Sequence, residues 1–197
     1  MKPVSFPAGR APLSKIAHLP HWGVDLMIGD TRALGDPALL DRHQVTTILN
    51  CAVNLDVNLV PSAITPVGHL TCGHARHRYY KIGLIDGAGN PPNQLIGAYY
   101  ILRAALDQVM PEKLSYPNQA RGNVMVNCRG GRSRSVTVVA LFLHLELPDT
   151  FPTLDAAIAH TRDKRGLPPE EWHEAPKPVL VDAARRAAIR IRQLDNV

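Results

Sequence analysis

The stretch that most constrains the fold is residues 123–143, in which two apolar runs flank a glycine- and arginine-rich turn. Residues 123–126 are short, apolar and partly β-branched, as in a buried strand. Residues 136–143 form a longer apolar run, typical of a buried helix. The turn between them, within VNCRGGRSRS, places a cysteine among glycines, arginines and serines. Together these pieces predict a strand, a tight loop and a buried helix.

The rest of the chain alternates strand-like and helix-like segments, which is the pattern of an α/β domain. We expect strands near 25–30, 45–53, 78–85 and 123–127 and helices after Asp36-Pro37 and over 95–109, 134–147, 154–165 and 178–194. Residues 1–20 are expected to be an irregular lead-in, and 54–78 a long loop with some strand. The predicted fold is α/β, with a small, mostly parallel central sheet flanked by helices.

Composition narrows the class of protein. The chain has 197 residues, 45% of them apolar, and a formal charge of +5, which favours an anionic partner or substrate. The basic residues are scattered and few aromatics lie among them, so we expect no nucleic acid partner. Three cysteines without regular spacing indicate a reducing compartment rather than a disulfide scaffold. We therefore expect a cytoplasmic protein with no integral membrane segment; its oligomeric state stays open.

The turn has the chemistry of an anion site. If its glycines let residues 128–134 curl, successive backbone N–H groups point into one concavity at a helix N-terminus, where a phosphate fits. Arg134 would add a two-pronged donor across two phosphate oxygens. The same positive field would lower the pKa of Cys128 from about 8.5 to roughly 3.5–7.5. Cys128 is thus the candidate nucleophile, attacking phosphorus to form a phosphocysteine.

The spacing Cys-x-x-Gly-x-x-Arg-Ser resembles the signature loop of the cysteine-dependent protein tyrosine phosphatase superfamily. The wider chain is similar to its dual-specificity branch, because four other stretches come in that branch's order: DLMIGD, the helix ending near Gln44, VTTILNCA and YYKIGLIDG. The resemblance covers about residues 24–165. It implies a dual-specificity phosphatase-like fold, with one phosphatase domain over 21–197 that includes the C-terminal helix. It also implies a phosphatase without metal or cofactor.

The resemblance extends to further site residues. Asp86 follows a strand about forty residues before the cysteine, where the family carries its catalytic aspartate, and would shuttle the proton to and from the leaving group. Ser135 corresponds to the hydroxyl that helps the thiolate leave. The family usually has histidine where this chain has Asn127, which can orient the loop by hydrogen bonding but brings no charge. A smaller depression of the Cys128 pKa is therefore expected.

The loop also bears on the substrate. The residues expected to bind phosphate are Arg129, Gly130, Gly131, Arg132, Ser133 and Arg134. Arg129 and Arg132 lie where lipid-directed members often carry basic residues, and CRGGRSRS is similar to the loop of phosphatidylglycerophosphate phosphatases. Two further cations would favour a second anionic group. The function we expect is that of a dual-specificity protein phosphatase. The alternatives are a phospholipid or small-molecule phosphatase and a phosphate-binding pseudophosphatase.

Two cysteine features have simpler explanations. Cys51 ends a predicted strand; some family members hold a second cysteine that traps the oxidised nucleophile as a disulfide, but a small buried side chain explains it as well. Cys72, His74 and His77 fit none of the zinc patterns with paired ligands, so no metal site is expected.

Overall fold

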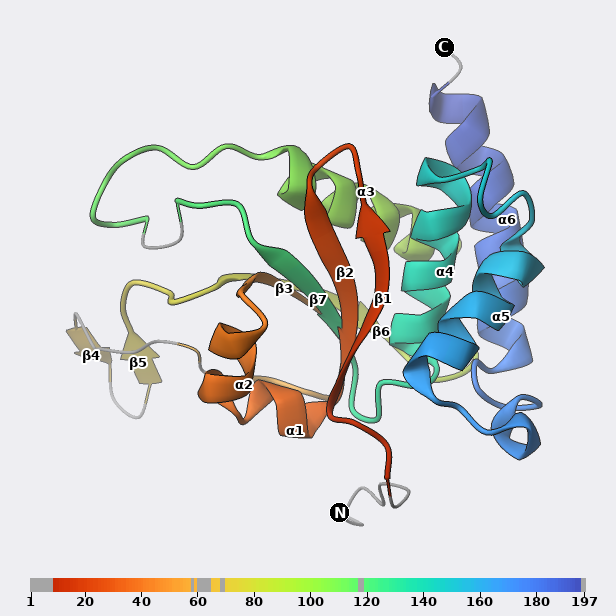
Figure 1. The fold of residues 1–197 in the computed structure, drawn as a ribbon, viewed down its shortest axis with the longest axis horizontal. Helices are drawn as coiled ribbons and strands as arrows, with labels where there is room; N and C mark the ends of the chain where they lie inside the picture. The colour runs from red at the N-terminus through yellow and green to blue at the C-terminus, as the bar shows by residue number, and fades with distance from the viewer. Residues whose placement is uncertain (1–8, 58, 60–64, 68–69, 117–118, 196–197) are drawn as a thin grey trace.

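The computed structural model describes residues 9–57, 59, 65–67, 70–116 and 119–195, which form a central sheet with helices on both faces (Figure 1). In chain order the described elements are β1 (Leu13–Leu19), β2 (Val24–Gly29), α1 (Thr31–Leu34), α2 (Pro37–Arg42), β3 (Val45–Ala52), β4 (Thr65–Val67), β5 (Leu70–Cys72), β6 (Arg78–Leu84), α3 (Gln94–Asp107), β7 (Asn123–Asn127), α4 (Arg134–Glu146), α5 (Leu154–Arg165), the 3₁₀ helix η1 (Pro169–Glu171) and α6 (Pro178–Asp195).

The five-stranded sheet has the order β1-β2-β7-β3-β6. Strands β2, β7, β3 and β6 run parallel to one another, and only β1 is antiparallel within this sheet. Asn127 pairs in register with Gly29 of β2 and with Asn50 of β3. The predicted α/β fold with a mostly parallel sheet is confirmed. Because parallel strands end at the same edge, the loops after β7, β3 and β6 come together there, where ligands usually bind in such sheets.

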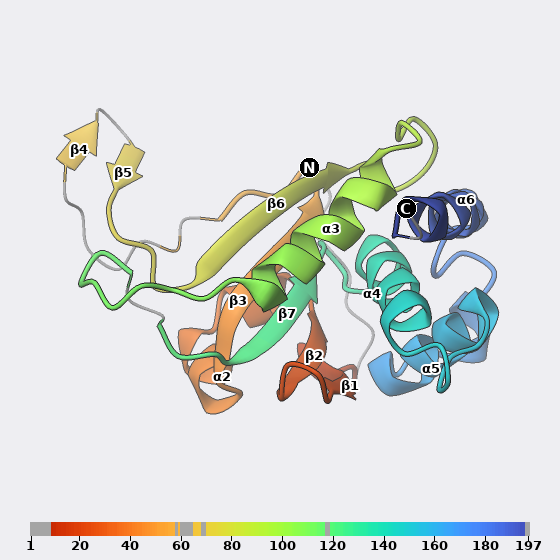
Figure 2. The same ribbon diagram turned by 90° about the horizontal axis from the view of Figure 1, so that it is seen from above.

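Alternation along β7 divides the core between the two faces of the sheet. Val124 and Val126 pack into a large cluster with α3, α4, α5 and α6, whereas Met125 packs into a smaller one with α1 and α2. Figure 2 shows α3 and α4 on one side of the sheet and α2 on the other. Cys128 continues the alternation on the larger side, so its side chain joins the main core.

Helix α4 is the centre of that core. Every residue from Arg134 to His144 is buried. Each buried Val, Leu or Phe contributes about 1.5–3 kcal/mol, so the helix that follows the glycine-rich loop is held firmly in place. Figure 1 shows α4 between the sheet and the outer pair α5 and α6.

The expectation of an irregular lead-in over 1–20 is wrong for residues 13–19, which form β1. The strand pairs with β2, and its register shifts between Lys15 and Ala17. Its buried positions recur every third residue, at Leu13, Ile16 and Leu19. The irregularity removes the period-two alternation that marks a strand in sequence, so the pattern gave no strand signal. Residues 1–8 of the predicted lead-in lie outside the described residues.

The expected long loop over 54–78 does contain some strand, because β4 and β5 form a short antiparallel pair there. Part of this segment lies outside the described residues. Among the residues that are described, none of the helices combines the length and apolar character that a bilayer crossing needs.

Candidate active site

The predicted nucleophile and the predicted acid lie at the edge of the sheet where the parallel strands end. Cys128 directly follows β7, and Asp86 lies two residues beyond β6. Asn54, two residues beyond β3, reaches the same place. Three segments far apart in sequence therefore meet, because the strands before them run in parallel.

The loop from Cys128 to Ser133 connects β7 to α4. Gly131 has a φ of +60°, and a Cβ there would lie 2.8 Å from the carbonyl oxygen of Gly29. Only glycine suits a backbone with that dihedral in so close an approach. The loop is also tied to α1, because the Thr31 N–H donates to the carbonyl of Arg129 at 3.2 Å.

Cys128 is buried, with 2% of its surface exposed, and still carries the electrostatics of a nucleophile. Burial raises the pKa of its thiol, but the charge of Arg134 and hydrogen bonds from Ser135 and from the backbone N–H of Arg132 lower the pKa by more, so the net shift is downward. The Ser135 hydroxyl lies 3.3 Å from Sγ. The net effect favours a thiolate although the side chain is almost fully buried.

Arg134 is held by one end of its guanidinium. Its Nη1 donates to Asn54 Oδ1 at 3.0 Å and to the carbonyl of Leu84 at 3.2 Å. Its Nε is buried and has no hydrogen-bond partner among the described residues, with Asp86 Oδ1 4.0 Å away. A buried donor without a partner is costly unless a ligand accepts its bond. The free edge of the guanidinium is the one a phosphate would occupy.

Asp86 lies on a compact loop that the Asn90 side chain holds together. Asn90 Oδ1 accepts from the Ile85 N–H at 2.8 Å, and its Nδ2 donates to the carbonyls of Ile85 and Gly87, each at 3.0 Å. The Asp86 side chain is 43% exposed. An exposed carboxyl close to Arg134 can exchange protons with solvent and with a bound phosphoester.

A buried ion pair between α5 and the end of β2 supports the loop from Cys128 to Ser133. Arg165 of α5 and Asp30, at the end of β2, have no exposed side-chain surface, and their Nη2 and Oδ2 atoms lie 3.3 Å apart. The Nε of Arg165 donates to the carbonyl of Gly131 at 2.9 Å. Burial lowers the pKa of Arg165 to about 10, and nearby Asp30 partly offsets that effect, so the side chain stays charged at neutral pH.

Other predicted residues differ in what surrounds them. Arg132 is ion-paired with Glu171 and Glu174, each at 3.2 Å. These carboxylates balance its charge, whereas the sequence alone suggested a free cation. The Nδ2 and Oδ1 atoms of Asn127 are buried without a hydrogen-bond partner among the described residues, so its orienting role stays a prediction. Burial raises the pKa of Cys51 well above its usual value, and the neighbouring charge of Cys128 raises it further.

Of the two histidines in the group Cys72, His74 and His77, His77 packs inside the protein and contacts the backbone. His77 is buried, and its Nδ1 lies 3.0 Å from the carbonyl oxygen of Val45. His74 is exposed, and the side chain of Cys72 lies outside the described residues.

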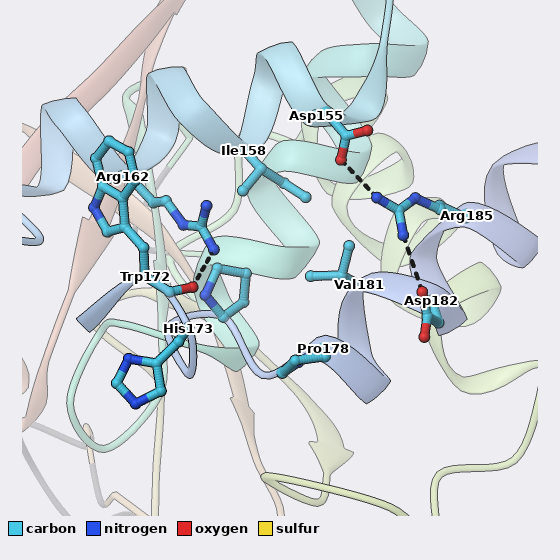
Figure 3. Close-up of a pocket in the computed structure, with 10 residues that line it drawn as sticks. Asp155, Ile158, Arg162, Trp172, His173, Pro178, Val181, Asp182 and Arg185 are labelled. Carbon is cyan, nitrogen blue, oxygen red and sulfur yellow. Dashed lines mark hydrogen bonds and ion pairs between the residues drawn. The ribbon is translucent and has the colours of Figure 1, made fainter. Parts of the chain in front are cut away.

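Residues 166–177, here called the strap, connect α5 to α6 and contact the loops after β6 and β7. On its outer side lies a cavity of about 300 Å³, which Figure 3 shows between α5, α6 and the strap. There Arg162 lies 5.4 Å from the centre of the Trp172 ring, and its Nη2 and Nε donate to the carbonyls of Trp172 and Ala175 at 2.6 and 2.9 Å. These contacts anchor the strap to α5. The residues that line the cavity are Asp155, Ile158, Arg162, Trp172, His173, Pro176, Pro178, Val181, Asp182 and Arg185.

Sequence reasoning missed several supporting residues, and most carry no local signal. Asn54 contacts Arg134, and Lys177 donates from its Nζ to the carbonyl of Asp86, both across long sequence separations. A single asparagine or lysine in a loop has no distinguishing pattern. Arg165 is the last residue of the helix predicted over 154–165, but no sequence pattern indicates that its side chain is buried. The Asp86-Gly87 pair is typical of a turn, and Asn90, three residues after Gly87, is a residue type that often holds such a turn together.

Comparison with solved structures identifies the fold as that of the dual-specificity phosphatases. Human DUSP28 matches with a TM-score of 0.65 at 18% identity, covering 95% of this chain and 99% of that one. Human tyrosine phosphatase-like serine/threonine/tyrosine-interacting protein matches with a TM-score of 0.57 at 18% identity, covering 91% of this chain and 97% of that one. PTPMT1 in complex with PI(5)P matches with a TM-score of 0.57 at 16% identity, covering 94% of this chain and 99% of that one. No protein-family model and no curated protein matches the sequence.

Proposed function

We propose that this protein is a cysteine-dependent phosphatase that hydrolyses phosphomonoesters, with phosphorylated proteins (tyrosine, serine or threonine) as its substrates. The observation that carries the proposal is a fully buried cysteine whose pKa is nevertheless lowered, beside an arginine with a free donor edge. A structural cysteine in such a place has a raised pKa, as Cys51 does.

The first step forms a covalent intermediate. The Cys128 thiolate attacks phosphorus, a P–S bond forms, and the bond from phosphorus to the ester oxygen breaks. The carboxylic acid of Asp86 gives its proton to that oxygen, so the alcohol leaves neutral. Arg134 and the backbone N–H groups of residues 129–134 hold the equatorial oxygens, as a preorganised donor set does for developing charge.

The second step regenerates the enzyme. Water attacks phosphorus as the Asp86 carboxylate accepts its proton, and the P–S bond breaks. The Ser135 hydroxyl, 3.3 Å from Sγ, donates a hydrogen bond to the departing thiolate. Inorganic phosphate leaves, and both Cys128 and Asp86 return to their starting protonation states.

Two alternatives have specific support. The likeness to PTPMT1 in complex with PI(5)P favours a phospholipid substrate. The unpartnered amide of Asn127, in place of a cation beside the nucleophile, favours a pseudophosphatase that binds phosphate without turnover. A reducing compartment such as the cytoplasm suits both phosphatase versions, because their nucleophile is a free thiol.

The test is phosphate release from phosphopeptides, inositol phospholipids and phosphatidylglycerophosphate, with Cys128→Ser as the blank. Turnover that depends on Cys128, highest on phosphopeptides, is the expected result. Preference for a lipid would select the first alternative. Binding of vanadate or phosphopeptide without turnover on any substrate would select the second.

A further inference from the structure

The strap places two carboxylates on the arginine in the middle of the phosphate loop. Arg132 Nη1 lies 3.2 Å from Glu171 Oε2, and Nη2 lies 3.2 Å from Glu174 Oε1. Glu171 also accepts from Arg10 at 2.9 Å. The four side chains carry two positive and two negative formal charges, so the group is neutral where the sequence alone predicted a cationic rim.

The strap continues from this group to the acid loop. The Lys177 N–H donates to the Ser133 hydroxyl oxygen at 3.2 Å, and its Nζ donates to the carbonyl of Asp86 at 2.9 Å. One side of the site is therefore bordered by the strap from Arg132 to Asp86. The charged groups on this side include the carboxylates of Glu171 and Glu174, both bound to Arg132 of the loop.

Exposure makes these charges matter for binding rather than for stability. The side chains of Arg132 and Glu174 are 41% and 44% exposed, and that of Glu171 is 18% exposed. The ion pairs made by the half-exposed Arg132 side chain contribute only about 0–1 kcal/mol to folding. An incoming anion must displace Glu174 from Arg132 or lie beside a carboxylate, whereas an incoming cation meets an exposed carboxylate directly.

We propose that Glu171 and Glu174 determine specificity: by neutralising Arg132 they make the site select phosphomonoesters flanked by neutral or cationic groups and discriminate against those with a second anionic group. This inference rests on the phosphatase function proposed above. It reverses the substrate preference that the two loop arginines suggest by themselves.

The experiment uses three peptides with one phosphotyrosine that differ only in the neighbouring residue: lysine, glutamine or glutamate. The wild-type protein is expected to show the highest kcat/KM on the lysine peptide and the lowest on the glutamate peptide. In the Glu171→Gln/Glu174→Gln variant, Arg132 is unopposed, so the glutamate-to-glutamine ratio of kcat/KM rises about threefold to tenfold. Adding Arg132→Gln to that variant removes the gain.

Glu170→Gln is the matched control, since Glu170 is an exposed strap residue that makes no ion pair among the described contacts. The ratio is expected to stay at the wild-type value in this variant. If loss of the ion pair between Arg10 and Glu171 prevents folding, Glu174→Gln alone replaces the double variant. The discrimination should also weaken between about 0.1 and 1 M salt, as the Debye length shortens from about 10 to 3 Å.

Binding of the same peptides to Cys128→Ser versions of each protein gives a readout that does not need turnover. Unchanged ratios in both measurements for Glu171→Gln/Glu174→Gln would overturn the specificity proposal while leaving a Cys128-dependent phosphatase intact. Absent turnover combined with shifted binding ratios would instead overturn the phosphatase function and keep the charge selection.

Discussion

The Nζ of Lys177 donates a hydrogen bond of 2.9 Å to the backbone carbonyl of Asp86. The donor lies on the strap and the acceptor on the loop after β6, so the bond links the strap to the loop that carries the candidate acid. It acts on the backbone of Asp86 and leaves the carboxyl free for proton transfer. Lys177 is thus a positioning residue for the candidate acid.

Replacing Lys177 with methionine should impair protonation of the leaving group. We expect kcat to fall about tenfold for phosphate esters of weakly acidic alcohols, within the range that a general acid supplies, and much less for esters of acidic phenols. The measurement is the dependence of kcat on leaving-group pKa. Lys164→Met, at an exposed position on α5, is the control. An equal fall for both kinds of ester would contradict the positioning role.

Replacing Asn54 with alanine should weaken oxyanion binding. Asn54 Oδ1 fixes Nη1 of Arg134 and so leaves the opposite edge for phosphate. Loss of a hydrogen bond to a charged group costs about 1.5–3 kcal/mol, so the Ki of vanadate should rise at least tenfold. Asn93→Ala is the control, because Asn93 makes no side-chain capping bond at the start of α3. Equal Ki values for wild type and Asn54→Ala would show that Arg134 orients without this contact.

The sequence predicted what depends on local patterns. The patterns in residues 123–146 predicted a strand, loop and helix, which the structure has, and the Cys128–Arg134 spacing predicted a phosphate-binding loop between them. Long-range partners were different. The pairing of Arg132 with Glu171 and of Arg134 with Asn54 depends on how the strap and the β3 loop fold back, over separations that no periodicity reports. Strand β1 was missed because its irregularity hides the alternation.

The lowered pKa of Cys128 predicts a pH dependence of both reactivity and stability. The rate of alkylation by iodoacetamide should report a pKa below the value of about 8.5 for a free thiol. Because the pKa is lower in the folded protein, ionisation stabilises the fold above the unfolded pKa, and this contribution is lost as pH falls through the folded pKa.

The free energy of unfolding relative to Cys128→Ser, measured by urea titration across pH, tests the sign. Cys51 provides the internal contrast. Its pKa is raised, so the contribution of its neutral thiol is present below the unfolded pKa and is lost as pH rises. Cys51→Ala should therefore give a slope of opposite sign. The same slope for both variants would contradict the assignment of Cys128 as the thiolate.

Replacing Asn127 with histidine should lower the pKa of Cys128 further. The Asn127 amide is buried next to the nucleophile and makes no hydrogen bond among the described residues, so little is lost by removing it. A histidine that is protonated there adds a positive charge beside the thiolate. We expect faster alkylation and higher kcat below neutral pH. Asn127→Gln keeps an amide without charge and is the control; an equal effect of both changes would rule out an electrostatic cause.

Replacing Asp30, the buried partner of Arg165, should lower the free energy of unfolding much more than replacing the exposed Asp155. Asp30→Asn leaves the guanidinium of Arg165 buried without its carboxylate, 2.9 Å from the carbonyl that it holds at Gly131. Breaking a buried pair by removing one partner typically costs about 3–5 kcal/mol. The exposed pair of Asp155 and Arg185 provides the control, because Asp155→Asn should cost less than about 1 kcal/mol. Urea unfolding of the two variants measures both values. Similar losses would mean that water reaches Arg165 and that the phosphate loop does not depend on this ion pair.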